Sequence, residues 1–256
     1  MARERFVLTA SVGTGGMNRP ADVRALRGRL IDLGFTWLVL NATMDESLVR
    51  AINLVQSIMG GRDKLSGDGR VDVPGKVYPW LQAVNAPRWG FLPAGSPAEG
   101  FVNAELADSM DRHDFGVSWL GILIRVAGAA HLEWLKTHAD RPRALLTLND
   151  ASLPTGGETP DHAGHETGLA VDLRLPRMDG STGGVTWQSD DFDRETTEAH
   201  LRAIARTGMV RQVFFNDPKM IAAGLCQHWD GHDDHLHVGA RVPPMGPPEL
   251  VPDAPT

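Results

Sequence analysis

Two segments rich in histidine and aspartate carry most of the side chains that could do chemistry. Residues 162–172 read HAGHETGLAVD and residues 228–237 read HWDGHDDHLH. Leaving aside His228, these two segments hold five of the ten histidines in the chain. Histidine is rarely gathered in this way without a metal-binding or proton-transfer role. The pattern therefore predicts one site built from both segments.

The spacing within the segments favours a metal site with three protein ligands. The first segment offers His165 and, seven positions later, Asp172, while the second offers His235 and His237. Two ligands from one segment and one or two from a distant one leave a fourth position open, which is typical of catalytic zinc. The single cysteine, Cys226, excludes both a disulfide framework and a cysteine-rich zinc site. Any metal must be held by histidine and carboxylate, and Cys226 is expected to be buried.

Strands and helices that alternate without a repeat must position these residues. Strands are predicted at 169–173, which carries Asp172, at 210–215 and at 235–238, and a short β-like run at 144–148. His235 and His237 would face one side of their strand because alternate residues share a face. Helices are predicted over 120–135, 197–206 and 218–225, with His131 packed in the core. This mixture favours the α+β class.

The first part of the chain predicts a small unit of three helices. Apolar residues recur at helical spacing from Val23 to Leu33, from Leu48 to Met59 and from Val77 to Val84, and Gly34 is positioned to end the first helix. We therefore divide the chain into residues 1–88 (helical domain), 89–100 (a linker rich in proline and glycine), 101–241 (the domain with the metal residues, built on a central antiparallel sheet) and 242–256 (a proline-rich, disordered tail). The linker is either free or docked on a neighbouring surface through Trp89 and Phe91.

Composition excludes several classes of protein. The net charge of −7 and the pI of about 5.8 argue against a nucleic-acid-binding protein, which would carry a basic surface. No stretch approaches the roughly 18 apolar residues of a membrane-spanning helix, so we expect no membrane insertion. The apolar run near the N-terminus is too short for a signal peptide. We expect synthesis in the cytoplasm without one.

The helical region resembles a peptidoglycan-binding module. The matching segments are GGMNRPADVRALRGRLIDLGF, LVRAINLVQ and DGRVDVPGKVYPWL. The sequence departs from that family at Val55, where an aromatic residue is usual, and in residues 36–47, which lack the first Asp-Gly turn. Peptidoglycan is the partner that this resemblance implies; the alternative is a helical cap that steadies the second domain.

The second domain resembles the penicillin-insensitive murein endopeptidases, which belong with the lysostaphin-type and D-Ala-D-Ala-cleaving zinc peptidases. The resemblance covers residues 148–241 and lies in LNDASLPTGG, HxxHExGLxVDL, FFNDPKMI and GHDDHLHV. It implies that His165, Asp172 and His237 bind Zn²⁺. It further implies that His235 is the general base or transition-state stabiliser and that His162 and His232 line the site.

Several positions depart from the family pattern: Gly164, Glu166 and Ala170 replace residues that are usual there, and Asp234 stands where an aromatic residue is frequent. Asp234 lies three residues before His237, the spacing at which related carboxypeptidases and L-Ala-D-Glu peptidases carry an acid that activates the zinc water. The base could therefore be His235 or Asp234. We favour His235, because a nearby metal lowers the pKa of a carboxylate and so weakens it as a base.

The two resemblances together predict a zinc-dependent peptidoglycan D,D-endopeptidase, in which the first domain tethers the second to its polymer. The alternatives are an L-Ala-D-Glu peptidase, a D,D-carboxypeptidase, or a non-catalytic peptidoglycan-binding protein. A wall-cutting enzyme without a signal peptide would act in the periplasm as a phage lysin released through a holin pore, or as an effector delivered by a secretion machine.

Overall fold

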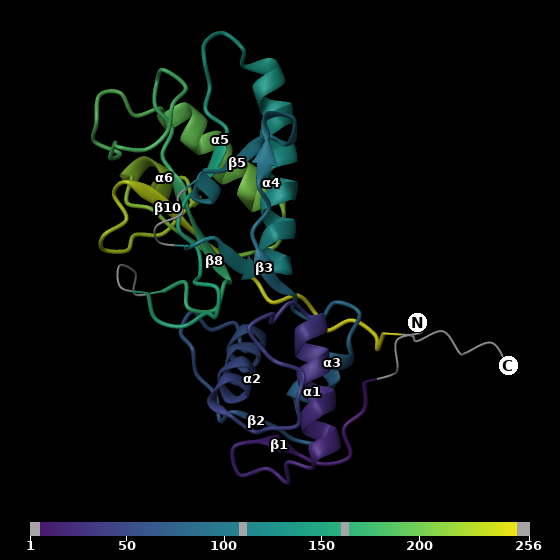
Figure 1. The fold of residues 1–256 in the computed structure, drawn as a ribbon. Coiled ribbons are helices and arrows are strands. Elements are labelled where there is room, and N and C mark those ends of the chain that lie inside the picture. The colour runs from purple at the N-terminus through teal and green to yellow at the C-terminus, as the bar shows by residue number, and fades with distance from the viewer. Residues whose placement is uncertain (1–5, 108–111, 160–163, 250–256) are drawn as a thin grey trace, which may run out of the picture.

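The computed structural model describes residues 6–107, 112–159 and 164–249. It shows an α+β protein with two lobes (Figure 1). The lower lobe in that view holds β1 (Val12–Gly13), α1 (Pro20–Asp32), α2 (Glu46–Met59), β2 (Arg70–Val71) and α3 (Val77–Gln82). The later elements are β3 (Trp89–Phe91), β4 (Gly95–Ser96), β5 (Phe101–Asn103), β6 (Phe115–Val117), α4 (Ser118–Thr137), β7 (Leu146–Leu148), β8 (Ala170–Arg174), α5 (Arg194–Arg206), β9 (Val210–Phe214), α6 (Pro218–Ala222) and β10 (His235–Ala240), with short 3₁₀ turns at Pro97–Glu99 and Glu105–Ala107.

The first lobe contains more than helices, because β1 and β2 form a two-stranded antiparallel sheet. The apolar face predicted for α1 is buried, and Gly34 follows the helix with φ of 98°. Asp45 caps α2 by accepting a hydrogen bond from the Leu48 N–H. The buried guanidinium of Arg27 forms an ion pair with Asp45 and donates to the Thr43 carbonyl, which ties α1 to the segment that precedes α2.

A six-stranded sheet in the order β4-β5-β7-β8-β10-β9 organises the second lobe. The neighbouring strands are antiparallel, as predicted, except that β5 and β7 run parallel. This exception arises because the chain travels through β6 and the long helix α4 between β5 and β7 (Figure 1). A crossover of that length can return the chain to the same end of the sheet.

Helices α4 and α5 pack together and cover one face of this sheet. Leu173 of β8 and Val238 of β10 face these helices and are buried. Strand periodicity then directs Asp172 and His237 to the opposite face. His131 of α4 is fully buried and lies against the Ala144 carbonyl, so the prediction that it is a packed core residue is confirmed.

Residues 89–100 differ from the predicted linker, because they contain β3, β4 and a 3₁₀ turn. Strand β3 pairs with β6, and β4 forms the edge of the six-stranded sheet. The physical reason is Trp89, whose ring is buried and whose indole N–H donates to the Pro154 carbonyl at 2.8 Å. The same ring packs against Phe35 and Trp37 of the first lobe, so this large aromatic side chain holds the segment between the two lobes.

The described part of the proline-rich tail, residues 242–249, is also ordered by contacts that the local pattern does not reveal. The Val84 N–H donates to the Pro247 carbonyl at 2.9 Å, and the Glu249 N–H donates to the Gln82 carbonyl at 2.7 Å. Arg29 of α1 forms an ion pair with Glu249 at 3.0 Å. The tail therefore returns to the first lobe, in contrast to the disorder expected from its composition.

Candidate metal centre

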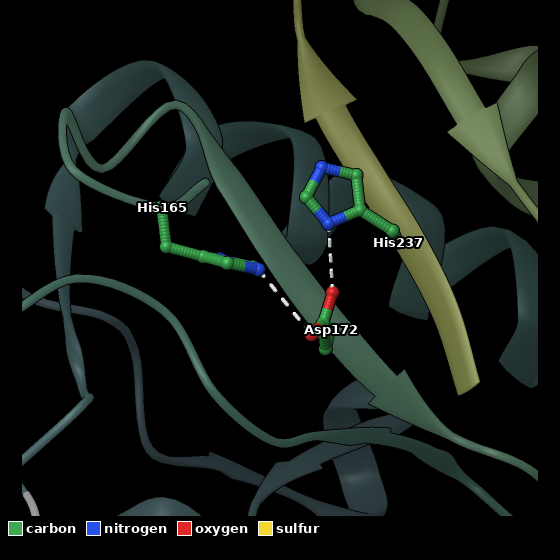
Figure 2. A group of neighbouring side chains, drawn as sticks. All are labelled: His165, Asp172 and His237. Carbon is green, nitrogen blue, oxygen red and sulfur yellow. Dashed lines mark hydrogen bonds and ion pairs between the residues drawn. The ribbon is translucent and has the colours of Figure 1, made fainter. Parts of the chain in front are cut away.

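Three side chains predicted as ligands, His165, Asp172 and His237, converge in a buried group that could hold a metal ion (Figure 2). Asp172 of β8 and His237 of β10 lie directly opposite one another in the antiparallel pair. Facing residues in such a pair have side chains within contact distance. The His237 Nδ1 atom is 2.9 Å from Asp172 Oδ1, so the strand register itself assembles this half of the group.

His165 reaches the group from a turn that precedes β8. Its Nε2 atom lies 3.3 Å from Asp172 Oδ2, while its Nδ1 faces the carbonyl oxygen of Ala170 at 3.3 Å. Donation from Nδ1–H to that carbonyl leaves the lone pair of Nε2 directed at the carboxylate side of the group, an arrangement that is frequent for metal-binding histidines. His165 also has φ of 66°, a left-handed backbone conformation that costs energy for a non-glycine residue.

The electrostatics of the group fit a bound cation. Burial opposes the ionisation of Asp172, but His165 and His237 outweigh it and hold the pKa of the carboxyl well below its usual value. Asp172 therefore carries its charge at neutral pH. A buried carboxylate facing two imidazole nitrogens is stable only when it is paired or coordinates a metal.

The group opens on one side to a cleft of about 1070 Å³. His165, Asp172 and His237 line this cleft, and His232, Asp234 and His235 line it as well. An ion bound by one atom from each of His165, Asp172 and His237 would keep a position open towards the cleft, as catalytic zinc sites do.

The two candidate bases, His235 and Asp234, contact each other. His235 Nδ1 lies 2.8 Å from Asp234 Oδ1, and its Nε2 lies 3.6 Å from Asp172 Oδ2. The Asp234 side chain is 63% exposed, whereas that of His235 is 23% exposed. The His235 ring therefore stands between Asp234 and the group of three, with one nitrogen directed at each.

His232 completes this side of the cleft, with its ring centroid 4.7 Å from that of His235. Its Nδ1 faces the carbonyl oxygens of Trp229 and Asp230, and burial together with the nearby His235 lowers the pKa of His232. His162, which was also predicted to line the site, lies outside the described residues.

Other residues singled out in the sequence lie apart from the group. The His228 side chain is 62% exposed and has Asp230 as its neighbour. Cys226 is buried against the Phe215 carbonyl, and burial raises the pKa of its thiol to about 11. Such a thiol is inert as a nucleophile or metal ligand at neutral pH.

Sequence reasoning missed the residues that support Asp172 from behind. The Asp172 N–H donates to the Asp150 carbonyl and the Asn149 N–H donates to the Asp172 carbonyl, both at 2.8 Å. The Asn149 side chain also accepts a hydrogen bond from Arg174 at 2.6 Å. The motif LNDASLPTGG contained the signal, because a polar Asn-Asp pair directly follows a buried apolar strand.

The first lobe supplies a further wall of the cleft that the sequence did not predict. Arg62, Asp63, Lys64 and Ser66, from the segment that follows α2, line the same cleft as His165. Nothing in the local sequence signals this contact, because about a hundred residues separate the two segments.

No protein-family model matches this chain, and no curated protein matches it either. Among the described residues, the helices are too short or too polar to span a membrane.

Proposed function

We propose that the protein is a zinc-dependent peptidase that cleaves peptide cross-links of peptidoglycan, with D,D-endopeptidase specificity. The observation that carries the proposal is the buried group of two imidazoles and one carboxylate, open to a cleft. The motifs that resemble murein endopeptidases supply the substrate class, since three of them contribute the residues of this group and its neighbours.

The chemistry of the three donors supports zinc as the ion. One ligand atom from each residue lies within 4.8 Å of the other two, so the three can reach a shared ion. His165 Nε2 lies 3.3 Å from Asp172 Oδ2, and His237 Nδ1 lies 2.9 Å from Asp172 Oδ1. Two imidazoles and a carboxylate are also ligands that zinc accepts in hydrolases.

The protein's own residues would divide the remaining work of amide hydrolysis. A bound zinc ion supplies a nucleophilic water of lowered pKa and polarises the scissile carbonyl. His235 would accept the proton of the attacking water at Nε2 and return it to the leaving amine. Asp234 would orient the ring through the bond to Nδ1, and His232 would line the cleft beside His235.

The first lobe would bind the same polymer, in keeping with its resemblance to peptidoglycan-binding modules. Its three helices and the docked tail would then hold the glycan strand near the cleft. An enzyme of this kind would act on the cell wall in the periplasm, as a phage lysin or as a delivered effector. The net charge of −7 argues against nucleic acid as a competing partner.

Digestion of purified sacculi and of defined cross-linked muropeptides tests the proposal, with mass spectrometry of the released fragments and elemental analysis of bound metal. We expect zinc bound at one ion per chain, hydrolysis that a chelator abolishes and zinc restores, and loss of both zinc and hydrolysis in Asp172→Asn. His228→Ala is the matched control and should keep both, because His228 is exposed and outside the group. Zinc binding without any released peptide would instead identify a non-catalytic binding protein.

A further inference from the structure

The wall that the first lobe contributes to the cleft is held in a fixed position. Arg211 of β9 donates to the Gly61 carbonyl and forms an ion pair with Asp63. The Leu65 N–H donates to the Glu166 carboxylate at 2.7 Å, and the Thr167 hydroxyl donates to the Arg62 carbonyl at 2.7 Å. The segment 61–66, which we name the α2 loop, is thus bonded to both sides of the metal group.

The position of these bonds links the α2 loop to the chemistry. Glu166 and Thr167 directly follow His165, and β9 is the neighbour of β10, which carries His237. A module that merely tethers an enzyme to its polymer would need no such contacts. The first lobe therefore forms part of the cleft in which a substrate would lie.

Two cations of the α2 loop line the cleft without an acidic partner among the described residues. Asp63 is neutralised by Arg211. Arg62 instead donates to the Ser66 hydroxyl at 2.7 Å, and Lys64 forms no hydrogen bond or ion pair within the described ranges. Both side chains are exposed and line the cleft. The acidic side chains that line the cleft have other neighbours: Asp234 contacts His235, Asp150 lies near His113, and Asp230 is 3.9 Å from His228.

We propose that Arg62 and Lys64 form a subsite that binds a free carboxylate of the substrate peptide, beside the bond that the metal group would cleave. The inference rests on the proposed function for the nature of the substrate. A guanidinium matches a carboxylate with two parallel hydrogen bonds, and the ammonium adds a second charge. Peptidoglycan stems carry such carboxylates, and they differ between walls by amidation, which removes one negative charge. The subsite would therefore select the unamidated peptide.

Binding of two small peptides tests this inference without requiring hydrolysis. The probes are the C-terminal amide of the tripeptide L-Ala–γ-D-Glu–L-Lys, in which the D-glutamyl α-carboxylate is the only carboxylate, and its counterpart with that group converted to a carboxamide. Each is titrated calorimetrically into the zinc-loaded full chain. Charge-assisted contacts at a partly exposed site predict that the carboxylate form binds at least about 5-fold more tightly. The double variant Arg62→Gln/Lys64→Gln should lose this preference.

The matched control is Arg24→Gln/Lys76→Gln, which removes the same two charges from exposed positions of the first lobe outside the cleft. This control variant should keep the preference for the carboxylate peptide. That result would show that the loss of two positive charges is not by itself what removes the preference in the Arg62/Lys64 double variant. Bound zinc and the thermal midpoint report whether each variant folds. If the Arg62/Lys64 double variant does not fold, the single variant Lys64→Gln replaces it, because the Lys64 side chain makes no polar contact within the described residues. This single variant must still show a weaker preference for the carboxylate peptide.

Equal affinity of the two peptides for the wild-type chain, or a preference that survives in the double variant, would overturn the inference. These outcomes are separable from failure of the proposed function. A chain that hydrolyses muropeptides but does not discriminate between the probes would retain the function and lose the subsite. A chain that discriminates but hydrolyses nothing would retain the subsite and lose the function.

Discussion

The contact between Asp234 and His235 allows the general base to be assigned by experiment. His235 lies with Nε2 3.6 Å from Asp172 Oδ2, beside the metal group, and with Nδ1 bonded to Asp234 at 2.8 Å. If His235 moves the proton, Asp234 acts only through it. The two single variants and the double variant then follow a non-additive pattern.

The expected magnitudes differ because the two side chains would do different work. Removing a general base costs about 10²-fold to 10⁴-fold in rate, so we expect a loss of this order in kcat/KM for His235→Gln. The Asp234 carboxylate is 63% exposed, so its hydrogen bond is screened by water. Loss of an orienting bond of this kind costs about 5-fold to 10-fold, which is the effect we expect for Asp234→Asn.

The assay is hydrolysis of one defined cross-linked muropeptide, with bound zinc measured for each variant. The double variant should be no slower than His235→Gln alone. Asp230→Asn is the control, because Asp230 lies in the same loop and its side chain is fully exposed. The reasoning is wrong if Asp234→Asn loses as much activity as His235→Gln and the two losses multiply, since Asp234 would then be the base.

Three further predictions concern stability. Burial lowers the pKa of His131 and holds the pKa of the fully buried His200 well below its usual value. Below about pH 6.5 the unfolded chain therefore binds more protons than the folded chain. The free energy of unfolding should be highest above this pH and should fall by up to about 1.4 kcal/mol per pH unit for each histidine as the pH is lowered. Urea unfolding at pH 7.5 and 5.5 measures this slope, which should shrink in His200→Leu and stay unchanged in His228→Leu. A Cβ at Gly34 would lie 1.9 Å from the Trp89 carbonyl oxygen, so Gly34→Ala should lower the thermal midpoint much more than Gly208→Ala, where no atom lies within 4 Å; equal shifts would contradict this. Zinc at a thousand times its Kd should raise the free energy of unfolding by about 4 kcal/mol and the thermal midpoint by roughly 8–16 °C. A thermal midpoint that does not change when a chelator is added would contradict zinc binding to the folded state.

Elements with strong local periodicity could be predicted from the sequence. The apolar spacing around Leu26 and Ile52 gave α1 and α2 to within a few residues, and the strand that carries His235 and His237 extends to Ala240. Residue type and spacing offered His165, Asp172, His235 and His237 as ligands. The resemblance to murein endopeptidases selected His165, Asp172 and His237, which the structure brings together. The helices and the strand depend on neighbours a few positions apart, which a single sequence contains.

Features that depend on distant contacts could not be predicted. The segment after Phe91 joins the sheet only because β4 pairs with β5, and the tail is ordered only because Glu249 meets Arg29 and Gln82. Proline and glycine in both segments locally favour irregular structure, and tertiary contacts overcame that preference. The α2 loop was missed for the same reason, since its bonds reach Glu166 and Arg211.

The chain passes between the two lobes twice, once between α3 and β3 and again after Ala240, where it returns to pair with residues 82–84. If a protease cut only the first crossing, the N-terminal fragment would stay bound to the rest of the chain. Residues 247–249, which remain covalently joined to the six-stranded sheet, would still form hydrogen bonds with residues 82–84. The two pieces would then migrate together until a denaturant separates them. Fragments expressed separately on either side of that cut should reassemble by complementation.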